Sequence, residues 1–449
     1  MLSSRPAIKR FCFAFFLILA TAAGGLAYDI LRVEQHFMVP LFHPSGAPIR
    51  QAQGERKESA VAPVAMAGGP AAVLVCMSTG DTGMDRCALL QHQAFIHAGI
   101  DSVLICHRGS YIAKTAIAQQ LPIIICSNAG ICSKRFAWLP GVQQAIRSQL
   151  ARCGKRLLAI QCNMPRELFA AKRAVAGTGI PVIFTQHTMH NIVSKELRQA
   201  ADGFIGMSRA VTEQFARLNE QEGIACPMLA LPPYFAHERF FAVKPQVARD
   251  VFFKQQFGVE LKQIPLLLKV AHLYTPLHIK NHPLLLRAMH ELIHNRGVPV
   301  QVALAGSGKQ DTLKKMVHDL HLDGYVHFLG STHLTPELFY YADVNLLASS
   351  NEAGGTALIE GGLFAKPTIA ATGTGAAGWL ITDQETGFLF ENNDALSLAD
   401  TIAAVLCNPG EAQACGQRLR ERVLVDFLPP QTVAKTLAFY KIIGKRLKP

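Results

Sequence analysis

Two glutamates, Glu352 and Glu360, stand around a glycine pair and the start of an apolar-periodic helix in the segment SSNEAGGTALIEGG. Gly354 and Gly355 allow another group to approach the backbone closely, because glycine has no Cβ. Thr356 begins the helix, where free backbone N–H groups can bind a phosphate while a nearby carboxylate accepts sugar hydroxyls. The two acids alone occur at this spacing by chance, so the interpretation depends on the elements around them.

Short apolar runs alternate with helical stretches from residue 71 onward, and they do so in two rounds. The first round is 71–76, 102–106, 121–126, 157–161, 180–185 and 203–207, and the second is 264–270, 299–305, 325–329, 343–347, 367–371 and 386–390. The intervening segments 84–98 and 140–152 carry apolar residues at helical spacing. Continuous apolar strands separated by helices predict parallel sheets covered on both faces.

The pattern weakens after Pro232 and Pro233, which predicts a junction between two domains. We expect an α/β protein with two Rossmann-like, doubly wound domains that face each other across a cleft, where the ligand lies beyond the strand ends. The predicted order is a hydrophobic signal or anchor segment at 1–28, a linker at 29–70, an N-terminal acceptor-side domain at 71–235, an interdomain linker at 236–262, a C-terminal donor domain at 263–425, and a C-terminal helix with a basic tail at 426–449.

In this setting of strand, loop, helix, Lys-Pro and strand, the sequence resembles the retaining GT-B glycosyltransferases with an E-x7-E motif (glycosyltransferase family 4, glycosyl transferases group 1). The resemblance covers roughly residues 71–425 and is closest in the second half, where it includes Gly306 and Gly308. It implies that Glu352 contacts the donor sugar near the reacting centre and that Glu360 binds the ribose hydroxyls. Two solvated or capping glutamates are the alternative.

A second matching position is Lys280, in HIKNHPLLLRA. The resemblance implies that this lysine lies against the donor diphosphate, where its charge stabilises the leaving nucleotide. The family commonly pairs it with an arginine, and the aligned residue here is His272. A histidine would make a weaker, pH-dependent clamp on the diphosphate.

In the first domain, the loop STGDTG contains Gly80 and Gly83 after the first apolar run. It stands where the family has a glycine-rich loop, although glycine turns follow many strands. His187, in VIFTQHTMHN, matches a family histidine placed after a strand, and the resemblance implies that it holds the transferred sugar. A structural histidine is the alternative, and His190 is the less favoured choice. Ser208 is interpreted as a helix cap.

No Asp-x-Asp pair stands where a metal-bound diphosphate would need one, and the resemblance does not require a metal. We therefore expect a metal-independent enzyme with no cofactor, whose co-substrate is a nucleotide sugar and whose acceptor is a glycan or a lipid-linked molecule. Retention would come from front-face attack helped by the leaving phosphate. A covalent intermediate is the alternative, for which no convincing nucleophile is seen.

Two other functions were weighed against transfer. A degenerate member of the family could bind a sugar nucleotide or glycan without transferring it. Two features favour this alternative: His272 replaces the arginine, and the prolines Pro232 and Pro233 stand where the family often has an Asn-Gly turn. A nicotinamide-dependent oxidoreductase would need G-x-G-x-x-G after the first strand, and Gly80 and Gly83 have the wrong separation.

The charge of +12, from 44 Lys and Arg against 32 Asp and Glu, predicts a surface that attracts anions. No basic stretch is interleaved with aromatic residues, so no nucleic acid is expected. A generally basic solvated surface is one interpretation. The other is a patch facing an anionic membrane, which the tail residues Lys441, Lys445, Arg446 and Lys448 favour.

The apolar stretch 11–28 follows three cations and resembles a signal peptide or a short membrane anchor, unless Met66 is the true start. Export would separate the enzyme from cytoplasmic donors. The odd count of 11 cysteines, several at the ends of apolar runs, favours a reducing compartment; Cys126 and Cys132 are a weak metal candidate. We therefore expect a membrane-associated enzyme whose catalytic domains face the cytoplasm.

Overall fold

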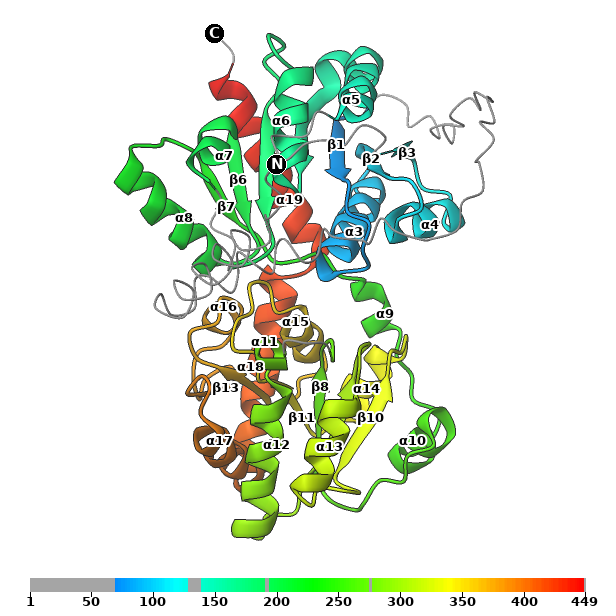
Figure 1. The fold of residues 1–449 in the computed structure, drawn as a ribbon, viewed down its shortest axis with the longest axis vertical. Coiled ribbons are helices and arrows are strands. Elements are labelled where there is room, and N and C mark those ends of the chain that lie inside the picture. Colours follow the sequence, from blue (N-terminus) through cyan, green and yellow to red (C-terminus); the bar gives the residue numbers. More distant parts are fainter. Residues whose placement is uncertain (1–68, 128–138, 190–193, 274–276, 448–449) are drawn as a thin grey trace, which may run out of the picture. The chain divides into compact units, whose positions relative to one another are not determined.

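The computed structural model describes residues 69–127, 139–189, 194–273 and 277–447, and its strands form two parallel sheets (Figure 1). The first sheet has the order β3-β2-β1-β4-β5-β6-β7 and the second β10-β9-β8-β11-β12-β13. The strands are β1 Ala71–Cys76, β2 Asp101–His107, β3 Ile123–Cys126, β4 Leu157–Cys162, β5 Val182–Gln186, β6 Gly203–Gly206, β7 Met228–Ala230, β8 Leu266–Val270, β9 Gln301–Ala305, β10 Val326–Gly330, β11 Val344–Leu347, β12 Thr368–Ala371 and β13 Phe388–Phe390.

Helices separate these strands, as the alternation of the sequence predicts. They are α3 Gly83–His97, α4 Tyr111–Ala118, α5 Pro140–Cys153, η1 Gly154–Arg156, α6 Pro165–Ala174, α7 Lys195–Ala200, α8 Arg209–Glu222, α9 His237–Phe241, α10 Arg249–Phe257, α11 Leu277–Lys280, α12 His282–His290, η2 Glu291–Asn295, α13 Asp311–Asp319, α14 Thr335–Tyr341, α15 Thr356–Gly362, α16 Ala377–Leu380, α17 Ala395–Cys407, α18 Pro409–Asp426 and α19 Pro429–Arg446. Ser208 caps α8 by accepting a hydrogen bond from Val211 N, which confirms its predicted role.

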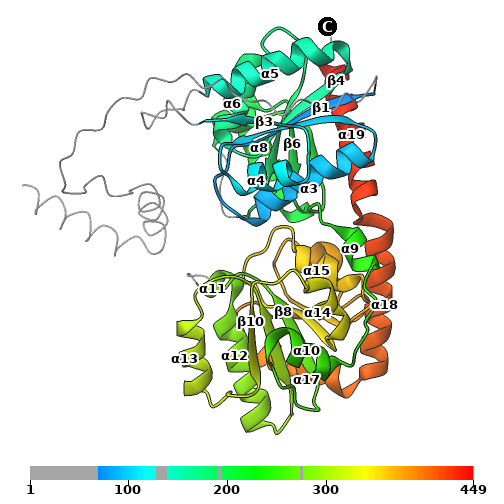
Figure 2. The same ribbon diagram turned by 90° about the vertical axis from the view of Figure 1, so that its right-hand side faces the viewer.

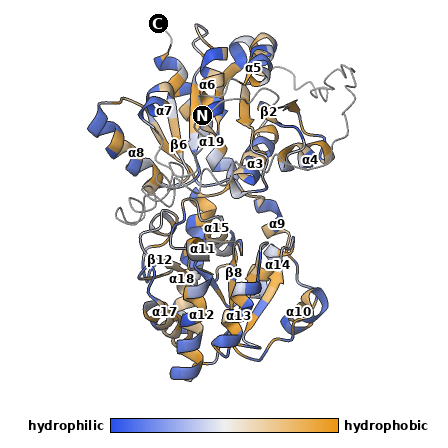
Figure 3. Ribbon diagram, in the orientation of Figure 1, coloured by the Kyte–Doolittle hydropathy of each residue, from blue (hydrophilic) through white to orange (hydrophobic). Residues whose placement is uncertain are grey.

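The apolar strands are buried because both faces of each sheet are covered. Side chains alternate along a strand: Val73 and Val75 of β1 enter the core cluster under α5 and α6, whereas Leu74 enters the cluster under α3 and α4. Figure 2 shows these helix pairs on opposite faces of the first sheet. In Figure 3 the strands carry mostly hydrophobic colours and the covering helices carry both.

The second sheet is built in the same way. Leu267 of β8 packs with α12, α13 and α17, while Leu266 and Leu268 pack with α10, α14, α15 and α18. The predicted fold class, with two doubly wound sheets, is therefore confirmed. All six runs predicted for each sheet are strands, with ends that shift by up to two residues.

The C-terminal helix α19 returns to the first sheet and packs against α3 and β4. Tyr440 is fully buried there and donates a hydrogen bond to Gln161, and the Tyr234 and Thr436 hydroxyls lie 3.0 Å apart. The predicted domain boundaries stay predictions. The contacts of α19 nevertheless group this helix with the first sheet.

The described residues include nine cysteines, and eight of them are free thiols: Cys76, Cys87, Cys106, Cys153, Cys162, Cys226, Cys407 and Cys415. Cys132 lies outside the described residues, as do His190, Lys448 and the apolar stretch 11–28. Within the ranges that the structure describes, no helix has the length and apolar character needed to cross a membrane.

Candidate functional site

Lys280 and Glu352 form an ion pair beyond the carboxyl ends of β8 and β11. These two strands are neighbours in the second sheet, so the segments that follow them meet at one edge. Lys280 is the last residue of α11 and Glu352 lies in the loop between β11 and α15; its Oε2 is 2.5 Å from Lys280 Nζ. The two side chains are 21% and 19% exposed, which leaves both accessible to a ligand. The structure thus brings together two of the three predicted catalytic residues.

A third charged group, Lys269 of β8, lies in the same neighbourhood but is completely buried. Within the described part of the chain its Nζ has no hydrogen-bond partner. Burial, together with the charge of Lys280, lowers the pKa of Lys269 to about 7. Sequence reasoning missed this residue, although a lysine inside the apolar run LLLKV is an unusual signal.

His272 follows β8 and is held by the loop that follows β9. The His272 Nδ1 and the Ser307 Oγ are 2.8 Å apart, and the Ser307 carbonyl accepts a hydrogen bond of 2.7 Å from Leu273 N. Gly306 is required here, because a Cβ at that position would lie 1.9 Å from the carbonyl oxygen of Ala271. Gly308 is similarly close to Leu273.

His272 carries little positive charge near neutral pH. Burial lowers its pKa below the usual value of 6.5, and the nearby Lys280 lowers it further. Its carbonyl oxygen lies 3.1 Å from Nε2 of the buried His282, whose pKa falls to about 3 chiefly through burial. The histidine that aligns with the family arginine is therefore a neutral hydrogen-bonding group.

The segment from Gly354 to Glu360 continues from the ion pair into α15. Gly355 has a φ of +57°, and a Cβ on it would lie 2.3 Å from the Cβ of Ala376, so only glycine fits before Thr356, the first helical residue. Glu360 lies on this seven-residue helix, and burial raises its pKa to about 8. Within the described part of the chain, the Glu360 carboxyl forms no hydrogen bond. Its acceptor capacity is thus available to a ligand.

The predicted loop of the first domain lies between β1 and α3. Gly83 is the first residue of α3, and Gly80 N donates a hydrogen bond of 3.2 Å to Ser78 Oγ. The buried Asp85 accepts hydrogen bonds from both the backbone N–H and the hydroxyl of Thr82, at 2.8 and 2.6 Å. These contacts order the loop, and a cap of this kind is common at any helix start.

His187 follows β5 and is oriented by Asn163, which follows β4. Its Nε2 lies 2.8 Å from the Asn163 Oδ1, which can only accept, so His187 donates there and its Nδ1 remains an acceptor. Burial lowers the pKa of His187 to about 4, and the ring is neutral. Sequence reasoning missed Asn163 and also Glu167, whose buried carboxyl accepts hydrogen bonds from three backbone N–H groups, those of Met77, Asn163 and Met164.

The described residues contain no group of three or more His, Cys, Asp and Glu side chains placed to hold a metal ion. Instead, the lysine can bind an anion, the carboxyls can accept hydrogen bonds from hydroxyl groups, and the histidines are neutral hydrogen-bonding groups. This chemistry suits a phosphorylated sugar better than a bound metal.

Residues 254–422 match the family model described as glycosyl transferases group 1. The match begins in α10 and reaches into α18, so it includes Lys280, Glu352 and Glu360. These residues form a group 1 glycosyltransferase domain.

Similar proteins extend the comparison to the first sheet. N-acetyl-alpha-D-glucosaminyl L-malate synthase of Bacillus anthracis is 24% identical over 319 residues, 67% of this chain and 79% of that protein. The Anabaena protein Alr3699/HepE, solved with UDP, has a TM-score of 0.67 at 18% identity and covers 82% of this chain and 100% of its own. A glycosyltransferase from Rickettsia africae ESF-5 has a TM-score of 0.68 at 17% identity, over 84% and 99%. The chain is a glycosyltransferase with the GT-B fold.

Proposed function

We propose that this glycosyltransferase takes a sugar from a uridine diphosphate sugar and transfers it with retention to a glycan or lipid-linked acceptor. The observation that carries the proposal is the Lys280 and Glu352 pair at the carboxyl edge of a group 1 domain. Structures of Anabaena HepE with UDP and with UDP-glucose support the choice of nucleotide. Glu360 and the loop around Gly306 would complete the donor site.

In this mechanism Lys280 stabilises the charge that develops on the leaving diphosphate. In the absence of donor, Glu352 is the counter-ion of Lys280. When donor is bound, Glu352 accepts hydrogen bonds from hydroxyls of the transferred sugar. His187, neutral and held by Asn163, accepts a hydrogen bond at Nδ1 from a hydroxyl of the same sugar. Front-face attack, with the leaving phosphate taking the acceptor proton, gives retention without a protein nucleophile.

The proposal is tested by binding and turnover on the full chain. UDP, GDP and ADP, and their glucose and N-acetylglucosamine forms, are compared by thermal shift, because a ligand that binds only the folded state raises its apparent stability. Release of UDP from the best donor is then measured with and without a chelator. We expect UDP forms to stabilise the protein and the chelator to leave turnover unchanged; restoration of chelated enzyme by manganese would contradict the metal-free mechanism.

His272 favours a second candidate, a protein that binds a sugar nucleotide or glycan without transferring it. Its neutral ring removes one positive charge from the diphosphate site. Tight UDP binding with no release of UDP from any donor, in the presence of a broad set of acceptors, would support this candidate over transfer.

We further propose that the enzyme associates with an anionic membrane surface and that both sheet domains face the cytoplasm. Buried free thiols such as Cys76, Cys106 and Cys162, and the cytoplasmic origin of nucleotide sugars, support this placement. Mass spectrometry of the native N-terminus and protease protection in spheroplasts test it. Processing near Ala22 or Ala27 with periplasmic access to the folded domains would overturn it, whereas an active, soluble chain after deletion of residues 1–65 is expected.

A further inference from the structure

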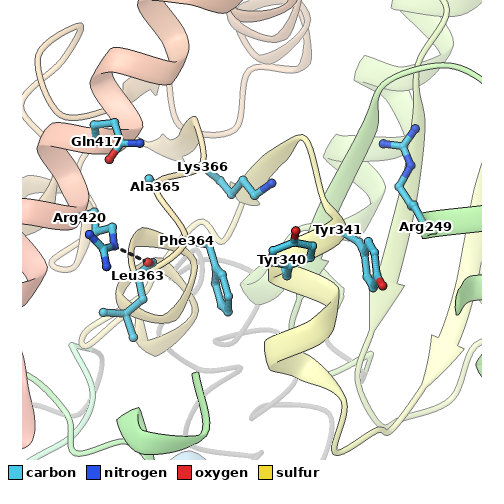
Figure 4. A pocket seen from close by; sticks show the side chains of 9 residues that line it. All are labelled: Arg249, Tyr340, Tyr341, Leu363, Phe364, Ala365, Lys366, Gln417 and Arg420. Carbon is cyan, nitrogen blue, oxygen red and sulfur yellow. Dashed lines mark hydrogen bonds between the residues drawn. The ribbon is translucent and has the colours of Figure 1, made fainter. Parts of the chain in front are cut away.

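A hollow of about 650 Å³ lies on the second domain, at the sheet edge opposite to the donor site. It is lined by Arg249, Tyr340, Tyr341, Leu363, Phe364, Ala365, Lys366, Gln417 and Arg420 (Figure 4). Tyr340 and Tyr341 end α14 just before β11, and the segment 363–366 comes just before β12. These are the amino ends of the strands, whereas Lys280 and Glu352 lie beyond carboxyl ends. The hollow therefore belongs to no part of the proposed catalytic machinery.

Three cations and no acid are among the residues that line the hollow. Arg249 is paired with Asp343 at 2.7 Å, which compensates its charge. Arg420 Nε donates to the carbonyl of Leu363 at 2.9 Å, and Lys366 Nζ lies 5.7 Å from the centre of the Tyr340 ring. In the described ranges no carboxylate forms an ion pair with Lys366 or Arg420.

Lys366 is partly buried, and this burial lowers its pKa. The cation has lost part of its hydration, and Asp343, the nearby acid that acts on it, is already ion-paired with Arg249. An anion in the hollow would therefore add to the compensation of this charge. Figure 4 shows Lys366 reaching into the space between the Arg420 side and the tyrosine side.

Exposed apolar side chains border the same hollow. Tyr340 and Val247 are each 40% exposed. The hydroxyl of Tyr341 donates to the carbonyl of Val247 at 2.6 Å, which fixes this segment beside α14. Three cations that share one nearby acid, next to exposed apolar groups, complement an anionic headgroup above hydrocarbon.

We propose that the basic hollow around Lys366 and Arg420 binds the phosphate of an anionic lipid headgroup at a membrane surface, while Tyr340 and Val247 enter the interface. A soluble phosphorylated sugar would use the cations but not the exposed apolar border. This proposal locates the membrane association proposed above, and it does not depend on sugar transfer. The tail cations Lys441 and Lys445 are exposed on α19 and are not among the residues that line this hollow.

The test places a tryptophan at the hollow and asks whether it reaches lipid. Full-length Tyr340→Trp is mixed with vesicles of brominated phosphatidylcholine, alone or with about one anionic phosphatidylglycerol in three lipids. Emission at position 340 should be quenched only when the anionic lipid is present. Leu396→Trp, at an exposed apolar residue elsewhere on the domain, is the matched control and should stay unquenched; Trp138 and Trp379 give the background of the natural chain.

Charge variants made in the Tyr340→Trp chain complete the test. The double variant Lys366→Gln with Arg420→Gln should raise the lipid concentration needed for half-maximal quenching about tenfold. The control double variant, Lys114→Gln with Lys155→Gln, removes the same charge elsewhere and should leave this concentration unchanged. Lys366→Gln alone, which keeps the Arg420 contact, guards against misfolding and should weaken the response severalfold. Vesicle binding without quenching at 340 assigns docking to another segment, such as 11–28 or the tail, and overturns the proposal. Inorganic phosphate that shifts the 340 emission where vesicles cause no quenching also overturns it, in favour of a soluble anion.

Discussion

Lys280 and Glu352 are 72 residues apart in sequence, yet their side chains meet at 2.5 Å. In the absence of donor each is the counter-ion of the other, so the lysine is already held at the edge of the sheet where a diphosphate would arrive. A pair arranged in this way can exchange partners on donor binding without a large movement. The two residues should therefore fail in different ways when changed.

Lys280→Ala should lower turnover about a hundredfold or more, because it removes a charge aimed at a developing oxyanion. Glu352→Gln should abolish transfer while UDP affinity stays within about tenfold, since the neutral amide loses contacts at the sugar rather than at the nucleotide. Calorimetric titration with UDP and a UDP-release assay separate the two effects. Glu385→Gln, at an exposed carboxylate, is the control; a Glu352→Gln enzyme with wild-type turnover would remove Glu352 from the site.

The raised pKa of Glu360 leads to a prediction about how UDP affinity depends on pH. Its pKa is raised to about 8 by burial, so near pH 7 the carboxyl of the free protein is mostly protonated. Hydroxyl donors favour the carboxylate, so donor binding lowers this pKa and UDP affinity should rise between about pH 6 and about pH 9. Glu360→Gln should flatten that dependence, and Glu360→Ala should weaken UDP by about 1 to 3 kcal/mol for each lost ribose hydrogen bond. Equal UDP affinity in Glu360→Ala and wild type would sink the ribose assignment.

Much of the fold could be predicted because both sheets are parallel. Strands buried on two faces give unbroken apolar runs such as AAVLVC and IIIC, and these stand out between amphipathic helices. β7 was missed because its three residues, Met228–Ala230, are only partly buried and stand between prolines in CPMLALPP. Lys280 and Glu352 were each predicted to follow a strand of the second sheet, but only the structure shows that these strands, β8 and β11, are neighbours and that the two residues meet.

The partners of the site residues could not be predicted in the same way. Asn163 orients His187 and Ser307 contacts His272, and each contact joins segments more than 20 residues apart. Local periodicity carries no information about such pairs. The pKa shifts were equally out of reach, because they depend on how deeply Glu360 and Lys269 are covered by other elements.

His272 should respond to substitution according to its charge. Burial and Lys280 lower its pKa, so near pH 7 the ring is neutral and His272→Ala should change UDP affinity by no more than about threefold. His272→Arg would restore a permanent cation and should strengthen UDP binding about fivefold at low salt. The control is His318→Arg, at an exposed position of α13. Titration with UDP at two salt concentrations checks this; an arginine variant that binds UDP no better would place His272 outside the diphosphate site.

Lys269 should weaken the folded state at neutral and acidic pH. Its pKa falls from the usual 10.5 to about 7, so between these values the unfolded chain binds the additional proton and stability must rise with pH. Below pH 7 both states carry the proton, and the penalty for a buried, unpartnered charge is complete. Lys269→Met should therefore stabilise the protein by on the order of 2 kcal/mol at pH 6, with a gain that shrinks toward pH 10. Urea denaturation across this range measures it, with exposed Lys315→Met as the control. A Lys269→Met protein whose stability follows the same pH slope as wild type would show that the buried amine does not titrate in this window.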